Sequence, residues 1–362
     1  YSSYIYLRIE VLILSTKSKH IPCLITIFGA TGDLSHRKLF PSIFHLFQQD
    51  NLDEHIAIIG IGRRDYSNEE FRDQVKSSIQ KHVKDTNRID EFMNHVFYHK
   101  TDVSDERSYE SLLQFSNQLD KELGLQGNRL FYLAMAPQFF GVISDFLKSS
   151  GLTNTKGFKR LVIEKPFGSD LKSAESLNNQ IRRSFKEEEI YRIDHYLGKD
   201  MVQNIEVLRF ANAMFEPLWN NKYISNIQVT SSEILGVEDR GGYYESSGAL
   251  KDMVQNHMLQ MVALLAMEAP ISLNSEDIRA EKVKVLKSLR QFKPEEVRKN
   301  FVRGQYGKGT IEGKEVKSYR EEDRVAEDSN TPTFVSGILT IDNFRWAGVP
   351  VYFRTGKLIK LI

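Results

Sequence analysis

The stretch from Leu24 to Leu34 reads LITIFGATGDL, in which a mostly apolar run leads directly into a glycine-rich turn. Its first half predicts a short buried strand over 24–28, and the helical spacing of apolar residues at 38–47 predicts a helix after the turn. Glycine in such a turn lets the backbone approach a ligand closely, and the first amides of the next helix face an anion. The complete G-x-G-x-x-G pattern is missing, so a nucleotide phosphate site and a tight turn without ligand both stay open.

The alternation of strand and helix continues to about residue 164. Short apolar runs predict three further strands, at 56–61, 130–133 and 161–163. Segments of helical period predict the helices between them, at 69–81, 108–123 and 139–147. Strands that are apolar on both faces and separated by helices are typical of a parallel, doubly wound sheet. We therefore expect an α/β fold whose first domain, residues 24–169, is Rossmann-like.

The pattern changes after residue 170. It predicts a long helix to about Phe185 and another at 248–267. Strand-like runs without short helices between them follow at 224–230, 283–286, 335–342 and 349–354. Such clustering is typical of a largely antiparallel sheet with helices on one face, so we expect an α+β domain over residues 170–362. The polar, glycine-rich residues 293–328 predict a long surface excursion.

Composition excludes several classes of protein. The 49 Lys and Arg residues almost balance the 48 Asp and Glu residues, so the surface lacks the single-sign field that nucleic-acid binding requires. Cys23 is the one cysteine, which excludes an internal disulfide and a thiolate metal site and indicates either a reducing compartment or indifference to redox state. No run approaches the roughly 20 apolar residues that cross a bilayer. We expect a cytoplasmic protein without a membrane span.

Two arginines follow the second predicted strand, at Arg63 and Arg64. Enzymes that prefer NAD tend to place an acid here, against the ribose 2′-hydroxyl, whereas a guanidinium fits a 2′-phosphate with two hydrogen bonds. One of these arginines is therefore the candidate determinant for NADP. A solvated basic loop is the alternative, and the neighbouring Asp65 weakens the argument.

The fourth predicted strand ends in Glu164-Lys165-Pro166. A lysine at the carboxyl end of a strand in this kind of sheet points into the crevice where ligands bind. Lys165 could instead pair with a neighbouring carboxylate. The peptide bond before Pro166 is a candidate for the cis form.

Residues 194–199 bring four chemical groups together: the carboxylate of Asp194, the imidazole of His195, the phenol of Tyr196 and the ammonium of Lys199. The last three are hydrogen-bond donors suited to a phosphate monoester dianion. His257 falls on the apolar face of the helix predicted at 248–267. It is either a core histidine or a general base that a carboxylate orients.

Several stretches together resemble the glucose-6-phosphate dehydrogenase family, in the family's order along nearly the whole chain. They are Gly29 to Leu34, Glu164 to Gly168, Arg192 to Lys199, Gly241 to Tyr244, Asp252 to His257 and Val349 to Lys357. The resemblance implies the first step of the oxidative pentose phosphate pathway. In that step D-glucose 6-phosphate is oxidised at C1 to 6-phospho-D-glucono-1,5-lactone, and the hydride passes to C4 of the nicotinamide of NADP.

The resemblance also implies the roles of single residues. His257 would be the general base, and Asp194 the carboxylate that orients it. The implied substrate contacts are Lys165, His195, Tyr196, Lys199, Glu233, Asp252 and Lys357. The implied cofactor contacts are Gly29, Ala30, Thr31, Gly32, Asp33, Leu34, Lys38, Arg63 and Lys165. No metal is needed, because hydride transfer requires only alignment and the removal of one proton.

The chain also departs from the family. Members continue well beyond the strand that ends at Lys357, where their pattern is polar and basic, whereas Leu358, Ile359, Leu361 and Ile362 are aliphatic. The second domain is therefore expected to be truncated, and residues 1–23 form an unassigned N-terminal extension. The family is typically a dimer or tetramer of identical chains. Two alternatives stay open: a sugar dehydrogenase of the glucose-fructose oxidoreductase type, and a remnant that binds NADP without turnover.

Overall fold

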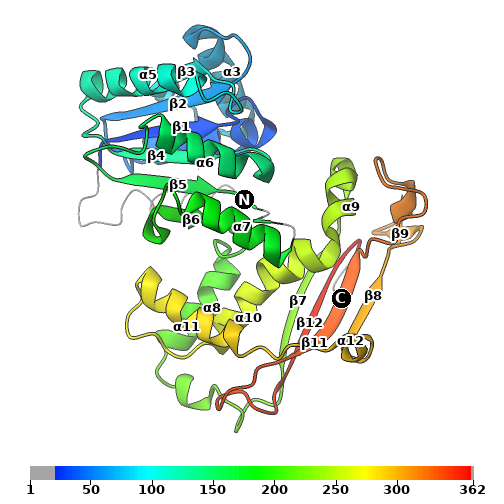
Figure 1. Cartoon of the computed structure of the whole chain (residues 1–362). Helices are drawn as coiled ribbons and strands as arrows, with labels where there is room; N and C mark the ends of the chain where they lie inside the picture. Colours follow the sequence, from blue (N-terminus) through cyan, green and yellow to red (C-terminus); the bar gives the residue numbers. More distant parts are fainter. Residues whose placement is uncertain (1–20, 166, 169, 360–362) are drawn as a thin grey trace. The chain divides into compact units, whose positions relative to one another are not determined.

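The computed structural model describes residues 21–165, 167–168 and 170–359, and these fold into two compact units (Figure 1). The first unit ends at Gly198 and the second begins at Lys199. The domain limits at residues 169 and 170 stay a prediction; the first compact unit continues past them. Most of the expected N-terminal extension and the expected cis bond at Pro166 lie outside the described residues. Among the helices that the structure describes, none is long and apolar enough to cross a membrane.

The first unit contains a six-stranded sheet in the order β3-β2-β1-β4-β5-β6, with every neighbouring pair parallel. Its strands are β1 Cys23–Phe28, β2 Ile56–Gly62, β3 Val96–Lys100, β4 Arg129–Leu133, β5 Lys159–Ile163 and β6 Ile190–Arg192. The predicted Rossmann-like sheet is confirmed. The sequence did not predict β3, in which buried and half-buried residues alternate, or β6, which has only three residues.

Helices cover both faces of this sheet (Figure 1). They are η1 Ser35–Leu39, α2 Phe40–Gln48, α3 Asn68–His82, α4 Ile89–Met93, α5 Ser108–Leu123, η2 Pro137–Phe139, α6 Phe140–Ser149, α7 Leu171–Ile181 and η3 Glu187–Glu189. The central strand β1 supplies both cores, because successive side chains of a strand point to opposite faces. Ile25 and Ile27 pack into one cluster with α2 and α3, and Leu24 and Phe28 pack into the other with α5 and α6. The helix after residue 170 ends at Ile181, earlier than predicted.

The second unit is built on a four-stranded mixed sheet in the order β7-β12-β11-β8. Its strands are β7 Ile227–Glu233, β8 Phe301–Gly304, β11 Phe334–Thr340 and β12 Pro350–Lys357. β12 pairs with β7 in parallel, while β11 pairs with β12 and β8 in antiparallel, so the expected α+β class is confirmed. The expected surface excursion holds more structure than predicted. It contributes β8 and a hairpin of β9 Gly309–Ile311 and β10 Lys314–Val316.

The helices of the second unit correct one prediction and refine another. They are α8 Asp200–Phe210, η4 Glu216–Leu218, η5 Glu238–Arg240, α9 Gly241–Ala249, η6 Leu250–Met258, α10 Leu259–Ala266, α11 Ser275–Lys287, α12 Pro294–Asn300 and η7 Tyr319–Glu321. The strand predicted at 283–286 is wrong, because those residues lie inside α11. The helix predicted at 248–267 is confirmed within two residues at each end as η6 and α10, although its first part is a π-helix, and Gly248, with φ +59°, separates it from α9. The amide of Ala249 donates to the carbonyl of Pro332, which holds this break in place.

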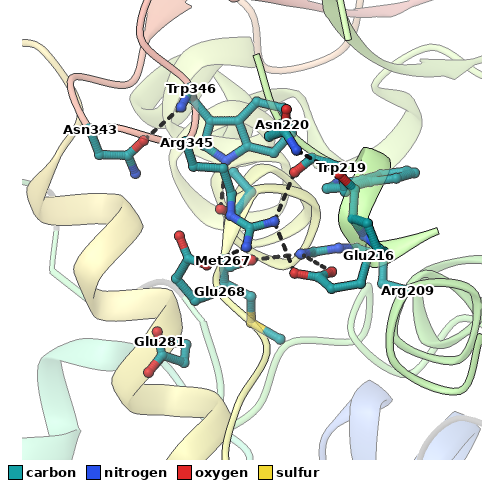
Figure 2. A network of polar contacts seen from close by, with 12 residues as sticks. Arg209, Glu216, Trp219, Asn220, Met267, Glu268, Glu281, Asn343, Arg345 and Trp346 are labelled. Carbon is teal, nitrogen blue, oxygen red and sulfur yellow. Dashed lines mark hydrogen bonds and ion pairs between the residues drawn. The ribbon is translucent and has the colours of Figure 1, made fainter. Parts of the chain in front are cut away.

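Side chains from three segments close the C-terminal end of α10 (Figure 2). The guanidinium of Arg209 donates to two carbonyls at 2.7 and 2.8 Å, and the indoles of Trp219 and Trp346 each donate to one at 2.7 Å. The four acceptors are consecutive: Leu264, Leu265, Ala266 and Met267. A helix leaves the carbonyls of its last turn without partners from the helix itself, so these donors complete its hydrogen bonding. These hydrogen bonds link α8 and the β11–β12 connection to the end of α10.

Candidate active site

The carboxyl ends of the parallel strands gather the predicted residues of the first unit along one edge. Arg63 follows β2, the glycine turn follows β1, Lys165 follows β5 and Asp194 follows β6. The strand order reverses at β1, which lies between β2 and β4. In open α/β sheets ligands bind outside the carboxyl ends at such a switch point. This edge is the candidate site of the first unit.

The turn after β1 requires glycine. Gly29 has φ +81°, and a Cβ atom there would lie 2.4 Å from the carbonyl oxygen of Ala134. The amide of Gly32 and the hydroxyl of Ser35 both donate to the carbonyl of Gly29, each at 3.0 Å. The strand, turn and helix predicted from this stretch are confirmed, with Lys38 in the π-helical turn η1 that precedes α2. A narrow turn before a helix leaves amides available to an anion.

Arg63 and Arg64 differ in what surrounds them. Arg64 donates to the hydroxyl of Tyr66 at 3.1 Å, and Asp65 pairs with Lys100 at 3.0 Å. Within the described ranges the exposed Arg63 forms no side-chain hydrogen bond or ion pair. Asp65, the acidic neighbour that weakened the case for NADP, therefore forms an ion pair with Lys100.

Lys165 and Asp194 form an ion pair, with Nζ 3.5 Å from Oδ1. The amide of Tyr196 donates to the same carboxylate oxygen at 2.9 Å, and Asp194 is only 8% exposed. The amide of Ile193 donates to the carbonyl of Ile163, which brings the end of β6 beside the end of β5. The interpretation that Lys165 pairs with a carboxylate is thus correct, and the pair lies at the candidate edge.

Sequence reasoning missed a further buried pair at this edge. The hydroxyl of Tyr132, on β4, lies 2.5 Å from Oε1 of Glu164. Burial raises the pKa of Glu164, against the opposing effects of the Tyr132 hydrogen bond and the Lys165 charge. Glu164 belongs to the quoted motif, but no local signal in β4 marks Tyr132 as its partner.

The loop after β6 presents the residues of the expected phosphate site. His195 is exposed and its ring lies edge-on to that of the buried Tyr196, with the ring centres 4.8 Å apart. Lys199 precedes the first turn of α8 with an extended backbone, and its side chain is half-buried. Three positions within five residues thus carry an imidazole, a phenol and an ammonium.

In the second unit, Glu233 and Lys357 end neighbouring strands. They are direct partners in the parallel register of β7 and β12, and their side chains form an ion pair. The ammonium of Lys357 also lies 5.7 Å from the ring centre of Tyr244. The side chain of Lys357 is 12% exposed and that of Glu233 is 36% exposed, so the carboxylate keeps access to solvent.

Asp252 and His257 both lie on the π-helix η6, which packs against β7 and β12. π-helical segments often occur at functional sites. His257 is 3% exposed, and Asp252 is half-buried and accepts a hydrogen bond from the hydroxyl of Tyr243 at 3.1 Å. Asp194 belongs to the first unit and His257 to the second, so their pairing stays a prediction.

A shallow cavity of about 540 Å³ lies at the opposite, amino-terminal edge of the first sheet. Bases and acids both line it, including Lys159, Lys186, Glu188 and Glu189. Opposite charges in one lining neutralise each other, and this edge is not where such sheets bind ligands. The candidate site therefore stays at the carboxyl edge.

Comparison with protein families gives two matches that together cover most of the chain. Residues 26–204 match the model described as glucose-6-phosphate dehydrogenase, NAD binding domain, and residues 206–361 match glucose-6-phosphate dehydrogenase, C-terminal domain. Among similar proteins, glucose-6-phosphate 1-dehydrogenase of Bacillus subtilis is 62% identical over 336 residues, covering 93% of this chain and 68% of that protein. The enzyme of the same name from Leuconostoc mesenteroides is 46% identical, covering 93% of this chain and 69% of its own length.

Solved structures agree with the sequence comparison. A glucose-6-phosphate dehydrogenase in complex with its substrate glucose-6-phosphate superposes with a TM-score of 0.86 at 38% identity, covering 94% of this chain and 70% of that one. Glucose-6-phosphate 1-dehydrogenase from Mycobacterium avium superposes with a TM-score of 0.80 at 36% identity, covering 93% and 69%.

Proposed function

The chain belongs to the glucose-6-phosphate dehydrogenase family, and we propose that it oxidises D-glucose 6-phosphate at C1 to 6-phospho-D-glucono-1,5-lactone. One observation carries the proposal beyond family membership: a nucleotide-type glycine turn and the start of a phosphate-type loop, residues 194–198, lie at the carboxyl edge of one parallel sheet. Such an edge can receive a dinucleotide and a phosphorylated substrate together.

The residues of the first unit fit a nicotinamide dinucleotide. The turn from Gly29 to Leu34 would receive the pyrophosphate, because a side chain at Gly29 would collide with Ala134 and the following amides favour an anion. Arg63 supports NADP over NAD, since its guanidinium is exposed and can pair with a 2′-phosphate. When bound, the nicotinamide supplies the hydride acceptor at C4.

The protein's own residues handle the proton. In the proposed reaction the C1–H bond breaks with its electron pair leaving as hydride, the C1 hydroxyl loses its proton, and a C1 carbonyl forms. His257 accepts that proton as general base, and Asp194 orients and stabilises the imidazolium. Both side chains are buried, which supports these roles. Burial fixes the direction of the Asp194 carboxylate and excludes water that would compete for its hydrogen bonds.

The remaining residues would hold the sugar phosphate. His195, Tyr196 and Lys199 are proposed to bind the phosphate, while Lys165, Glu233 and Asp252 bind sugar hydroxyls and Lys357 adds a basic contact. The phosphate is remote from C1, so its binding energy can align the reacting carbon. Unphosphorylated glucose is therefore expected to be a poor substrate.

A spectrophotometric assay tests this proposal. Absorbance of reduced nicotinamide is followed with glucose 6-phosphate or glucose as substrate, and with NADP or NAD as acceptor. The proposal expects turnover with glucose 6-phosphate, much slower turnover with glucose, and higher kcat/KM with NADP. Binding of NADP without any turnover would instead support the non-catalytic alternative, and equal rates with glucose would support a sugar dehydrogenase without a phosphate site.

The expected homo-oligomer and the cytoplasmic location stay predictions. The buried position of Cys23 in β1 is compatible with either redox state of the surroundings, since burial raises the pKa of this thiol to about 12 and makes it unreactive. Sedimentation of the full chain at several concentrations measures the oligomeric state.

A further inference from the structure

The motif Gly241-Gly242-Tyr243-Tyr244 has no part in the function proposed above, yet the structure puts both tyrosines beside proposed substrate contacts. It forms the first turn of α9. The hydroxyl of Tyr243 donates to Oδ1 of Asp252 at 3.1 Å, and the guanidinium of Arg240 lies 4.8 Å from the centre of its ring. Burial, and then the charge of Asp252, raise the pKa of Tyr243 to about 12, so the phenol stays a donor at neutral pH. One oxygen of Asp252 is thereby held in a fixed direction.

Tyr244 supports the other contact. It is 3% exposed, and its hydroxyl oxygen is buried without a hydrogen-bond partner among the described residues. The centre of its ring lies 5.7 Å from the ammonium of Lys357, which also forms an ion pair with Glu233. An ammonium held between a carboxylate and an aromatic face is restrained by a charge and by a cation–π contact.

Residues from Tyr319 to Ser329, nearly all within the expected surface excursion, contact α9 through Glu245 and Gly241. The hydroxyl of Tyr319 donates to Glu245 at 2.7 Å, and the ring of Tyr319 lies edge-on to that of Tyr244 with centres 6.2 Å apart. Ser329 donates to the same oxygen of Glu245 at 2.6 Å. A Cβ atom at Gly241 would lie 2.2 Å from the carbonyl of Asp323, so the start of α9 is pressed against this segment.

We infer that Tyr243 and Tyr244 are positioning residues for the substrate-binding carboxylate of Asp252 and the ammonium of Lys357. This inference rests on the proposed function. Tyr243 engages one oxygen of Asp252 and so directs the other toward a sugar hydroxyl. Tyr244 forms the apolar surface against which Lys357 is held. The segment from Tyr306 to Thr331, through Tyr319 and Ser329, sets the position of both tyrosines.

Binding measurements on three variants test the inference. Tyr243→Phe removes only the hydroxyl that faces Asp252, and Tyr244→Leu removes the ring beneath Lys357. The matched control is Tyr109→Phe in the first unit, where the buried hydroxyl donates to the carbonyl of Val103 at 3.2 Å. The dissociation constants for glucose 6-phosphate and for NADP are measured by calorimetry, and the KM and kcat by the nicotinamide assay.

We expect Tyr243→Phe to weaken glucose 6-phosphate binding about 10-fold, because a hydrogen bond to a charged group is lost. Tyr244→Leu is expected to weaken it about 5-fold, as a cation–π contact at a half-buried site contributes roughly that much. In both variants the dissociation constant for NADP and the kcat should stay within about 2-fold, whereas Tyr109→Phe should alter thermal stability alone.

Three results would overturn the inference. Glucose 6-phosphate binding by Tyr243→Phe equal to that of the parent removes the role of Tyr243, and an equal loss of NADP binding indicates general damage to the fold. If Tyr244→Leu fails to fold, Tyr243→Phe decides by itself. A parent chain that binds no glucose 6-phosphate would overturn the proposed function, and this inference with it.

Discussion

The two ends of the segment η6–α10 use charged and polar side chains in opposite ways. At the C-terminal end, Arg209 has no exposed side-chain surface and pairs with Glu216 at 3.1 Å while donating to two helix carbonyls. Arg345 pairs with the other oxygen of Glu216 at 2.9 Å (Figure 2). At the N-terminal end, Asp252 is half-buried and His257 lies on the same π-helix. One end directs its charges at protein groups, while the other leaves Asp252 accessible to a ligand.

The difference shows what each arrangement can contribute. Burial lowers the pKa of Arg209, and the Glu216 carboxylate opposes that effect. Burial also acts to lower the pKa of Arg345, but Glu268 and Glu216 outweigh it and the pKa rises. A buried ion network whose acceptors are helix carbonyls serves the fold, because removing one partner leaves uncompensated charge. A half-buried carboxylate can still exchange its solvent for a substrate hydroxyl.

The largest expected effect comes from the proposed base in the π-helical half of the segment, His257. His257→Asn should lower kcat by a factor on the order of 10² to 10⁴ with little change in KM, because proton removal in the transition state is lost. Stability should change less than in the variant at the C-terminal end described next. Steady-state kinetics with glucose 6-phosphate measure this, with His45→Asn in α2 as a histidine control outside the site. A kcat close to that of the parent would end the assignment of His257 as base.

At the C-terminal end the effect should fall on stability. Arg209→Met removes the cation that Glu216 and the carbonyls of Leu264 and Met267 share, so the free energy of unfolding should drop by about 3–5 kcal/mol. The KM for glucose 6-phosphate, measured where the variant is folded, should stay within about 2-fold. Urea unfolding measures the loss. If Arg209→Met kept the unfolding free energy of the parent but raised the KM, the C-terminal end would serve the site and not the fold, which would contradict the contrast between the two ends.

Helix α8 allows the same contrast within one element, since Lys199 precedes its first turn and Arg209 lies in its last. Lys199→Ala should raise the KM for glucose 6-phosphate by roughly 10- to 100-fold, because a charge-assisted hydrogen bond to the phosphate is lost. The unfolding midpoint should hardly move. Kinetics and thermal unfolding on the same preparation separate the two effects, and equal KM values in variant and parent would contradict the phosphate assignment.

Much of the fold could be predicted because it depends on local patterns. The helix predicted at 108–123 matches α5 Ser108–Leu123, since its apolar residues recur at helical spacing. The prediction failed where distant residues decide. The separate helix α9 was missed, and the break at Gly248 that ends it is held by Pro332, which accepts the hydrogen bond of Ala249 from 83 positions away. The strand predicted at 283–286 misread apolar residues of α11, of which Val285 is the buried one.

The candidate site shows the same division. Asp194, His195, Tyr196 and Lys199 could be found from the sequence because four functional groups lie within six residues. Tyr132, on β4, could not, since its partner Glu164 lies 32 residues away and nothing near it marks the contact. Outside the site, Arg209 was missed for the same reason: its acceptors lie 55 and 58 residues further along the chain.

The smallest expected effect tests whether burial of the charged side chains determines how much an ion pair contributes to stability. Arg290 and Asp342 form two hydrogen bonds of 2.7 and 2.9 Å, which is geometry as good as that of the buried network, but their side chains are 54% and 47% exposed. Asp342→Asn should therefore shift the Tm by no more than about 2 °C, because solvent and salt screen an exposed pair.

The pH dependence of that shift follows from the pKa of Asp342, which the hydrogen bonds from Arg290 lower below its ordinary value of 3.8. A carboxyl group whose folded pKa is lowered stabilises the fold fully above its ordinary pKa, and this contribution disappears as the pH falls through the lowered value. The difference between parent and Asp342→Asn in thermal unfolding should thus vanish in strong acid and shrink at about 1 M salt. If Asp342→Asn instead lowered stability as much as Arg209→Met, hydrogen-bond geometry rather than burial would determine the strength of these pairs, and the contrast between the two ends of η6–α10 would lose its physical basis.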